Sequence, residues 1–472
     1  MVMTLFFRSV CMLAACAVLG LAPLQANAQA SGLIKPVELA SQRKPDMPWK
    51  TYQATTVKHL LGAQPAAPSL TRYGGLSDVQ HDATGYFRVE NIDGRWWMID
   101  PDGHPLIRMS LGAVYRRTRH TEMTALPPEV LAHVQAEGGA RWAADTVKQF
   151  RDLGVNSLGR WSEFDVFIDT KNRIPYTTSL AFMAEFGEHI EVTFEKYGHQ
   201  GYRENCIPVF HPEFPAFCDA YAKEYAAPYA NDPYLVGHYT DNEMPVKRNL
   251  LEITLALDPN DKMLRYNHKA AWDWLKKRRG PNVSADDITT EDGQAYLGYV
   301  YEHYYKVTTA ALRKHDPNHL ILGTRLHGGA LKIKPVFAAA GKHLDVVSFN
   351  SYGRWDLSPE LMKSWADATN RPFVISEFCI KGNDSGLDNT KGAGWSVRTQ
   401  AERGVWYQNF IINLLQSPNC VGWDYFKYRD DLDVNKGVLT TDFKPHPEFY
   451  QAMKQMHEAV YDVVKHHDAC CQ

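Results

Sequence analysis

The sequence predicts an α/β fold, a (β/α)8 barrel of the TIM type, preceded by an extended N-terminal arm and a β-hairpin. Two observations support this prediction. From about residue 105, short apolar segments alternate with longer helical ones, which is typical of a parallel α/β fold. The apolar segments number eight, enough to close a barrel, and the span from residue 86 to about 460 exceeds the roughly 250 residues of a minimal barrel. Long loops are therefore expected.

The first 28 residues have the features of a signal peptide. Arg8 precedes an apolar run from Val10 to Leu24, and Ala26-Asn27-Ala28 supplies the small residues that signal peptidase accepts. Cleavage after Ala28 would make the mature protein secreted or periplasmic. A weaker alternative is a lipoprotein, because Leu13 to Cys16 resembles a lipoprotein cleavage box. The apolar run is too short to span a bilayer comfortably, and no membrane span is expected elsewhere.

Residues 29–84 contain many Pro, Ala and Gln and show little periodicity, so we expect an extended, partly disordered arm. A hairpin follows, because two alternating runs, 86–91 and 95–99, flank the turn residues Asp93-Gly94. The expected divisions of the chain are a signal peptide (1–28), the arm (29–84), the catalytic barrel with its hairpin (85–465) and a frayed, solvated tail (466–472).

The predicted barrel strands are 105–114, 154–160, 174–182, 235–241, 320–326, 344–350, 372–377 and 420–426. The third competes with 190–195 and 206–210. Helices are expected at 140–153, 212–229, 264–279, 291–314, 358–368 and 396–416. Thr289 and Asp292 form a capping box before the longest of these helices. The longest interruption lies between the fourth and fifth strands.

Charge and cysteine content exclude several classes of protein. The net charge is −3, and it becomes −4 once the leader with Arg8 is removed, so no basic footprint for nucleic acid or an anionic membrane is present. The basic run 276–279 ends a predicted helix, where cations suit the helix dipole. Six of the 8 cysteines follow the leader, which is sparse for this length. Cys206 and Cys218 could form a disulfide, but their spacing does not decide it.

The carboxyl ends of barrel strands are where active sites are built. The fourth strand ends in Asp241-Asn242-Glu243, and the seventh ends in Ser376-Glu377. Glutamates at these two ends face each other across the barrel, which is what a glycosidase needs: one carboxyl group protonates the leaving oxygen, and the other attacks the anomeric carbon. A single Glu at a strand end usually contacts solvent, but the pair, with Asn242 before the first, is more specific.

The chain resembles the retaining glycoside hydrolases built on (β/α)8 barrels, and among them most closely the agarases and related β-galactan hydrolases. The stretches that carry the resemblance are GRWWMIDPDGHP (94–105), DPYLVGHYTDNE (232–243), ISEFCIKGNDSGL (375–387), QAERGVWYQNF (400–410) and CVGWDYFKYRD (420–430). The resemblance implies that Glu243 is the acid/base and Glu377 the nucleophile. It implies these substrate-site residues: Asn242 on the hydroxyl beside the anomeric carbon, Arg160 near the nucleophile, Tyr352 donating to Glu377, Trp423 as the sugar platform, and, less directly, His327.

Simpler interpretations stay open for several of these residues. Arg160 could form a salt bridge at the barrel rim, Trp423 and Tyr352 could be core residues, and an ordinary polar role for His327 is favoured over a site role. The substrate could be another β-glycan (a mannan, a glucan or a β-galactoside), or the barrel could bind carbohydrate without cutting it.

No cofactor or metal is expected, since the chain has no glycine-rich phosphate loop and no His-Glu ligand motif. The acidic loop 431–442 resembles a calcium loop, but Gly437 stands at the seventh position, where the sixth is required. The expected partner is a polysaccharide or oligosaccharide substrate. The oligomeric state is not predicted.

Overall fold

The computed structural model describes residues 37–116, 126–196 and 199–471, and these described residues belong to one compact unit. The predicted signal peptide and the lipoprotein alternative at Cys16 lie outside the described residues. Within the described part of the chain, no helix is both long and apolar enough to cross a membrane.

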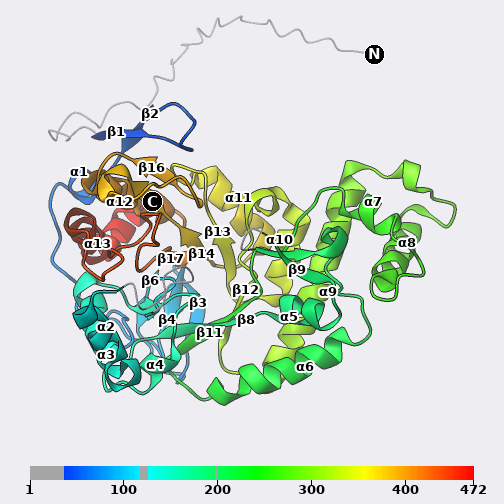
Figure 1. Ribbon diagram of the computed structural model, residues 1–472, viewed down its shortest axis with the longest axis horizontal. Coiled ribbons are helices and arrows are strands. Elements are labelled where there is room, and N and C mark those ends of the chain that lie inside the picture. The colour runs from blue at the N-terminus through cyan, green and yellow to red at the C-terminus, as the bar shows by residue number, and fades with distance from the viewer. Residues whose placement is uncertain (1–36, 117–125, 197–198, 472) are drawn as a thin grey trace, which may run out of the picture. The chain divides into compact units, whose positions relative to one another are not determined.

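Eight parallel strands form the central barrel, and the predicted (β/α)8 fold is confirmed (Figure 1). Consecutive barrel strands pair with each other, except the fifth and sixth, and the last strand pairs with the first. The fifth and sixth strands are joined by the bridge Leu326↔Phe349. In order, the strands are β6 (Arg108–Leu111), β7 (Ser157–Leu158), β8 (Tyr176–Leu180), β11 (Leu235–Thr240), β12 (Leu320–Gly323), β13 (Val347–Asn350), β14 (Phe373–Phe378) and β17 (Cys420–Tyr425).

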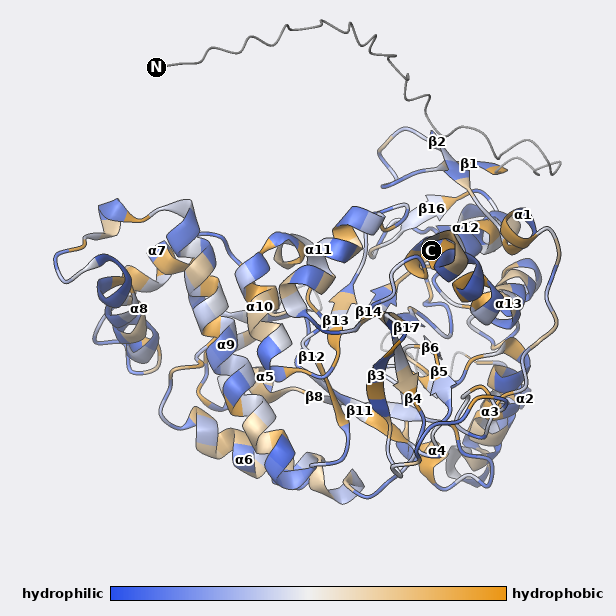
Figure 2. Ribbon diagram, turned by 180° about the vertical axis from the view of Figure 1, so that it is seen from behind, coloured by the Kyte–Doolittle hydropathy of each residue, from blue (hydrophilic) through white to orange (hydrophobic). Residues whose placement is uncertain are grey.

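Helices follow every barrel strand and surround the sheet, as Figure 1 shows. In Figure 2 they carry hydrophobic and hydrophilic residues on the same helix, as expected when one face packs on the strands. They are α2 (Pro128–Gln135) and α3 (Ala140–Leu153) after β6, α4 (Asp165–Ile168) after β7, α5 (Phe182–His189) and α6 (Phe214–Tyr225) after β8, α7 (Leu250–Leu255), α8 (Arg265–Arg279) and α9 (Thr290–His315) after β11, α10 (Lys334–His343) after β12, α11 (Pro359–Thr369) after β13, α12 (Gln400–Leu414) after β14, and α13 (Pro447–Cys471) after β17.

An antiparallel sheet closes the N-terminal end of the barrel. It consists of β3 (Arg88–Ile92), β4 (Arg95–Ile99) and β5 (Pro105–Leu106), and it contains the predicted hairpin. The backbone N–H of Trp96 donates to the carbonyl of Pro418, just before β17, at 2.7 Å. Side chains from this sheet and from Tyr73 pack with inward-facing strand residues in a second core cluster: Tyr73, Phe87, Met98, Leu106, Val236, Tyr239, Leu320, Leu322, Val346, Val374 and Val421.

Nearer the mouth, the barrel interior is polar. Arg108 and Asp424 form an ion pair at 2.7 Å, and each is 1% exposed. Tyr239 donates to the same carboxylate at 2.7 Å. Because buried charges are stable only when paired, this layer fixes how β6, β11 and β17 meet just below the site.

Residues 37–84, expected as an extended arm, contain ordered elements that the sequence analysis missed. A hairpin of β1 (Val37–Ser41) and β2 (Lys50–Ala54) is followed by α1 (Val57–Leu61). The segment is held by side-chain amides of α12, since Thr55 N–H donates to Asn409 at 2.9 Å and Val57 N–H to Gln408 at 3.0 Å. Such anchors pair residues hundreds of positions apart, so periodicity cannot reveal them.

Two short strand pairs and one helical insertion lie outside the barrel strands. β9 (Thr193–Lys196) pairs with β10 (His199–Tyr202), which explains why 190–195 competed with the third barrel strand without belonging to it. β15 (Ile380–Gly382) pairs with β16 (Trp395–Val397) after β14. The predicted long interruption between the fourth and fifth strands holds α7, α8 and α9, and the predicted capping box is confirmed, with Thr289 and Asp292 exchanging hydrogen bonds at 3.0 and 3.2 Å.

The prediction of a frayed tail from residue 466 is wrong. α13 continues to Cys471, and Asp468 accepts from Arg95 at 2.7 and 3.0 Å. His467 bonds to the carbonyl of Ile412 at 3.0 Å. The cause is Arg95, whose side chain is 4% exposed and requires an anionic partner.

The open question about a disulfide is answered by the structure. Cys206 and Cys218 are both free and buried, and the Cys206 thiol contacts the hydroxyl of Thr254 at 3.6 Å.

Candidate active site

The mouth of the barrel holds the two glutamates that the sequence singled out. Glu377 lies within β14 and Glu243 follows β11 by three residues, so both stand at the carboxyl ends of parallel strands. Glu377 is 8% exposed and Glu243 is half-buried. Their surroundings differ in ways that distinguish the two carboxyl groups chemically.

Glu377 accepts hydrogen bonds from three side chains. Its Oε1 accepts from the Arg325 guanidinium and from Trp161 Nε1 at 3.2 Å, and its Oε2 accepts from the Tyr352 hydroxyl at 2.7 Å. Burial, and then the charge of Glu377, hold the pKa of Tyr352 well above its usual value, so the phenol stays a donor. The expected contact between Tyr352 and Glu377 is therefore present, and the carboxylate is fixed on both oxygens.

Arg325, not Arg160, is the cation in contact with Glu377. Arg325 follows β12, is wholly buried and also donates to the carbonyl of Ser376 at 3.0 Å. Burial, the largest single influence, would lower the pKa of Arg325, but Glu377 together with Tyr239, Asp424 and Glu243 raises it above the usual value. Arg325 was not among the expected site residues, although it lies at the end of the fifth predicted strand, two residues before His327.

Arg160 lies near Glu377, as expected, but its hydrogen bond goes elsewhere. Its Nη1 donates to the carbonyl of Asp241, and its guanidinium lies 4.3 Å from the centre of the Trp161 ring. Burial and the nearby Arg325 lower its pKa to about 9. Glu377 is close enough to act on that pKa but is not its hydrogen-bond partner. Arg160 thus supports the backbone before Glu243 and the ring of Trp161.

The loop that carries Glu243 is pinned by its first residue. The Asp241 carboxylate accepts from the N–H groups of Met183 and Ala184, in the first turn of α5, at 2.8 and 3.0 Å, and from the Tyr304 hydroxyl at 2.6 Å. Asp241 and Glu243 both adopt left-handed backbone conformations, with φ of 46° and 49°. Such strain persists where surrounding contacts over-determine it, and it is common at functional sites.

Asn350 connects Glu243 to the strand that carries Glu377. Its Nδ2 donates to Glu243 Oε1 at 2.7 Å, and its Oδ1 accepts from Ser376 at 2.8 Å. Asn350 is also the β13 residue in register with Glu377. Both carboxylates are close enough to Tyr352 to raise its pKa. One amide therefore orients Glu243 relative to the strand that bears Glu377.

Two further predicted site residues have buried polar atoms without a partner among the described residues. They are Asn242, through its Oδ1, and His327, through its Nδ1. Both side chains are half-buried and follow β11 and β12. Because buried polar atoms are nearly always hydrogen-bonded, these two atoms are suited to a ligand or water.

The expectation that Trp423 forms the sugar platform is wrong. Alternation along β17 places Asp424 inside the barrel and Trp423 outside, under the helices. Trp423 is wholly buried and donates to the Tyr407 hydroxyl at 2.9 Å. The alternative interpretation, that it belongs to the core, is the correct one.

Two other aromatic residues stand at the mouth. Trp161, next to Arg160, is 38% exposed and donates to Glu377. Phe426, just past the end of β17, is half-buried. The ammonium groups of Lys436 and Lys427 lie 5.5 and 5.9 Å from the centre of its ring. Lys427 pairs with Asp431, whereas Lys436, 8% exposed, has no acidic partner in the described part of the chain.

A buried cluster elsewhere has the residue types of a metal site: His238, Asp316 and His319. Its ring nitrogens are already used. His238 bonds to Thr178 at 2.6 Å and to Asp316 at 2.7 Å, and His319 bonds to Asp316 at 2.7 Å and to the carbonyl of Asp232 at 2.9 Å. Burial opposes the charge of Asp316, but its bonds to the two histidines lower its pKa far below the usual value. The cluster is a hydrogen-bond network.

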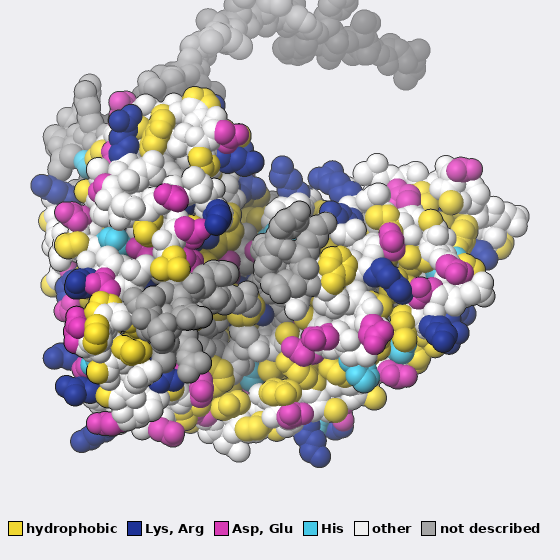
Figure 3. Space-filling model, in the orientation of Figure 1, with side chains coloured by type: hydrophobic (Ala, Val, Ile, Leu, Met, Phe, Trp, Pro, Cys, Tyr) yellow, Lys and Arg dark blue, Asp and Glu magenta, His cyan; other side chains and the backbone are white. Residues whose placement is uncertain are grey.

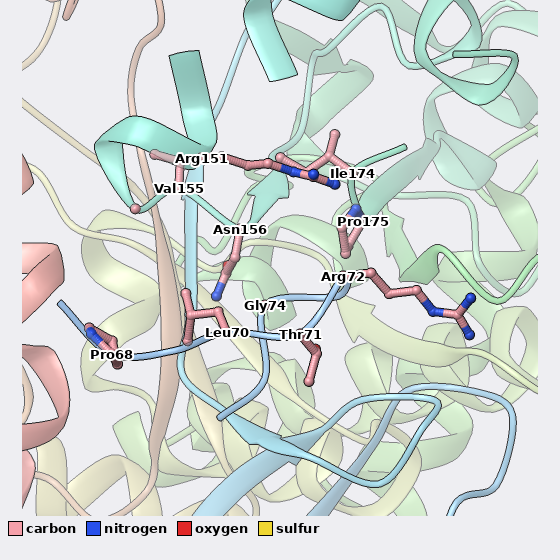
Figure 4. Close-up of a pocket in the computed structure, with 11 residues that line it drawn as sticks. Pro68, Leu70, Thr71, Arg72, Gly74, Arg151, Val155, Asn156, Ile174 and Pro175 are labelled. Carbon is pink, nitrogen blue, oxygen red and sulfur yellow. The ribbon is translucent and has the colours of Figure 1, made fainter. Parts of the chain in front are cut away.

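A pocket of about 310 Å³ at the opposite end of the barrel lacks a catalytic pair (Figure 4). It lies beside the residues that precede β7 and β8, with Arg72 and Arg151 at its walls. Arg72 is bound to both oxygens of Asp102 at 3.1 Å, and Arg151 donates to the carbonyl of Arg173 at 3.2 Å. The N-terminal end of a barrel serves stability rather than chemistry.

Comparisons with known proteins agree with the resemblance predicted from the sequence. No model of a known protein family matches the chain. β-Agarase B of Vibrio sp. (strain JT0107) is 24% identical over 84% of this chain and 50% of the agarase, and β-agarase A of the same strain is 25% identical over 61% of this chain and 32% of the agarase. The chain thus spans half or less of the length of these relatives.

Among solved structures, that of BpGH50 is similar with a TM-score of 0.81 and 28% identity, over 92% of this chain and 96% of that one. The agarase AgWH50C has a TM-score of 0.69 at 23% identity, over 86% and 68% of the two chains. An exo-β-agarase has a TM-score of 0.67 at 21% identity, over 85% and 69%. The predicted likeness to agarase-type barrels is confirmed.

Proposed function

We propose that this chain is a retaining glycoside hydrolase that cleaves a β-linked galactan of the agarose type by double displacement. The observation that carries the proposal is the pair Glu243 and Glu377 at the barrel mouth, linked through Asn350 but held in different environments. The similarity to proteins named β-agarase supports the substrate class.

Glu377 is proposed as the nucleophile. Three donors fix its orientation, and one of them is the guanidinium of Arg325, which makes a charge-assisted hydrogen bond. An oxygen of Glu377 would attack the anomeric carbon while the glycosidic bond breaks, which leaves the sugar covalently bound as an ester. Arg325 and Tyr352 would then support the departing carboxylate in the second step.

Glu243 is proposed as the acid and then the base. It would protonate the leaving oxygen in the first step and take a proton from the attacking water in the second. The amide of Asn350 can donate to Glu243 in either protonation state, because one carboxyl oxygen accepts in both. Retention requires the two carboxyl groups to lie roughly 5 Å apart, whereas inversion needs about 8 Å.

Substrate binding is proposed for the polar and aromatic residues around this pair. Asn242 would bind the hydroxyl beside the anomeric carbon, and His327 another sugar oxygen, which would satisfy their buried, unpartnered atoms. Trp161 and Phe426 offer apolar ring faces on which a pyranose can stack. Lys436 can donate to a sugar oxygen from beside Phe426.

Chemical rescue tests the two roles. Glu377→Ala removes the nucleophile, so turnover should fall by several orders of magnitude, and added azide should give a glycosyl azide of inverted configuration. In Glu243→Ala, a substrate with an activated leaving group needs no acid; the intermediate should accumulate, and azide should give the retained configuration. Glu252→Ala, an exposed residue of α7, is the control and should keep full activity. The opposite configurations would mean that the roles are exchanged.

A screen of oligosaccharides distinguishes the proposed substrate from other glycans, and a hydrolase from a protein that only binds carbohydrate. Purified protein is offered defined galactan, mannan, glucan and β-galactoside oligosaccharides, and products are sized by mass. Cleavage of galactan alone agrees with the proposal, and cleavage of another glycan replaces its substrate. Binding without cleavage of any of them would indicate a carbohydrate-binding barrel.

Export is also proposed, because the leader has the sequence features of a signal peptide. Mass spectrometry of the protein from its native cells should show Gln29 as the first residue of a secreted or periplasmic form. A lipid-modified N-terminus at Cys16 would favour the alternative.

A further inference from the structure

The segment between Glu243 and α9 forms an excursion with one unpartnered face. It carries α7 and α8, which extend beyond α9 away from the barrel strands (Figure 1). α8 packs on α7 and α9 through Asn267, Ala271 and Leu275, which are buried at spacings of four residues. The opposite side of α8 is exposed, and Figure 2 shows this helix as mostly hydrophilic.

That exposed side contains an open pocket of about 690 Å³ with two aromatic rings. Tyr266 and Trp272 line it, and both are half-buried. The guanidinium of Arg265 lies 4.9 Å from the centre of the Tyr266 ring, and the ammonium of Lys276 lies 5.7 Å from that of Trp272. Each ring in the pocket is therefore accompanied by a cation.

The pocket has more positive than negative charge. Its walls include Arg265, Lys269 and Lys276 against the single carboxylate of Asp273, a surplus of two positive charges. Asp273 is already paired with Lys269 at 2.5 Å. Arg265 and Lys276 have no acidic partner among the described residues. The local surplus is notable in a chain whose net charge is −3.

The helix dipole favours Lys276 but not Arg265. Lys276 lies in the last turn of α8, where a positive charge is favourable, but Arg265 is the first helical residue, where it is unfavourable. The first turn contains no acidic residue to compensate. In the same last turn as Lys276, Arg278 pairs with Glu291 and Asp292, and Arg279 lies 3.7 Å from Asp292. Arg265, which donates to the Tyr266 hydroxyl at 2.9 Å, and Lys276 thus remain as cations without a carboxylate partner among the described residues.

We propose that this face of α8 is a second carbohydrate-binding site, distinct from the barrel mouth, for galactan segments that carry sulfate esters. This inference rests on the proposed function for its choice of a galactan. Sugar rings would stack on Tyr266 and Trp272, and sulfate groups would pair with Arg265 and Lys276. Positions 266 to 276 span about 15 Å along the helix, which suits a short run of sugar units.

A nucleic acid fits this surface less well. Figure 3 shows acidic and basic side chains interspersed over the visible face of the molecule rather than a continuous basic stripe. Nucleic-acid sites usually extend such a stripe over one face or along a helix. A pocket with two rings and two unpaired cations matches a small anionic glycan.

Binding is tested on the full chain with a sulfated galactan oligosaccharide and its desulfated counterpart. The double variant Arg265→Glu/Lys276→Glu should bind the sulfated probe about tenfold more weakly, since it loses two exposed charge contacts. Trp272→Ala should weaken both probes. Lys342→Glu/Lys363→Glu makes the same charge change on α10 and α11 and should leave both affinities unchanged. The wild type should prefer the sulfated probe, and this preference should decline with added salt.

Three results would overturn the site: equal binding of the two probes by the wild type, an equal loss of affinity in the control variant, or a single-stranded oligonucleotide that competes as well as the sulfated probe. Hydrolysis of a neutral galactan oligosaccharide is measured separately. Cleavage without a charge-dependent second site would leave the proposed function standing and remove this inference. Charge-dependent binding without cleavage would support the second site and contradict the proposed hydrolase activity.

Discussion

At the scale of single residues, the two glutamates depend on neighbours that the sequence did not single out. Arg325 and Trp161 share one oxygen of Glu377, and Asn350 holds Glu243. Arg325 and Trp161 have left-handed backbone conformations, with φ of 56° and 66°. The chemistry of each carboxyl group is set by these partners more than by its place at a strand end.

Arg325→Met tests the electrostatic support of Glu377. The variant should lose about a hundredfold in kcat, as is usual when one stabilising donor is removed from an active site. Tyr352→Phe removes a neutral donor and should cost less. An unchanged kcat in Arg325→Met would contradict this assignment.

Two aromatic substitutions distinguish a core residue, Trp423, from a proposed substrate-binding residue, Phe426. Trp423→Ala should lower the free energy of unfolding by about 3–5 kcal/mol, because it leaves a large cavity under α12 and α13. Phe426→Ala should instead raise KM with little change in Tm, since Phe426 is half-buried at the mouth. Thermal unfolding and steady-state kinetics of both variants provide the test. The reverse pattern would restore Trp423 as the platform.

Lys436→Met should change stability and binding in opposite directions. Lys436 is 8% exposed without an acidic partner, so replacing its charge with an apolar side chain of similar length should preserve or raise Tm. KM should increase about tenfold, because one charge-assisted hydrogen bond to the sugar is lost. A lower Tm with unchanged KM would show that the lysine is structural.

At the scale of elements, the loops that carry the glutamates are fixed by helices from elsewhere in the chain. Asp241 ties the end of β11 to the first turn of α5, and Tyr304 of α9 adds a third contact. α12 similarly holds the N-terminal segment through Asn409 and Gln408. The site therefore rests on rigid elements although its residues lie in turns.

The end of α13 offers a stability prediction. Asp468→Ala leaves the nearly buried guanidinium of Arg95 with only the carbonyls of Leu415 and Ser417 as acceptors. The free energy of unfolding should fall by about 1–3 kcal/mol while kcat/KM stays unchanged, since the contact lies at the N-terminal end of the barrel. Asp462→Ala, which removes an exposed ion pair on the same helix, should have almost no effect. Chemical denaturation compares the two; equal losses would contradict the proposed role of Arg95.

At the scale of the whole molecule, hydrogen bonds cross the layer between barrel and helices. Trp423 of β17 donates to Tyr407 of α12 at 2.9 Å, Tyr407 donates to His457 of α13 at 2.7 Å, and His457 donates to the carbonyl of Leu153 at 2.8 Å. Burial lowers the pKa of His457 to about 4. This neutral histidine makes global stability sensitive to acid.

The sign of that dependence follows from the lowered pKa. Below pH 6.5 the unfolded chain binds a proton at His457 that the folded chain does not, so the folded state loses stability as pH falls from about 6.5 to about 4. The loss at this residue is about 3 kcal/mol over that range. Unfolding of His457→Gln, measured at several pH values, should show a shallower decline than the wild type. Identical slopes would mean that His457 does not contribute.

The sequence by itself determined the barrel, the order of its strands and the places of Glu243 and Glu377. Alternation of apolar and helical segments is a local signal, and parallel strands necessarily bring their carboxyl ends to one side. Tertiary structure alone decided that Arg325 rather than Arg160 bonds to Glu377, that Asn350 ties Glu243 to Ser376 beside Glu377, and that Trp423 is a core residue. These outcomes depend on strand register and on the side to which a residue points, and a shift of one position reverses that side.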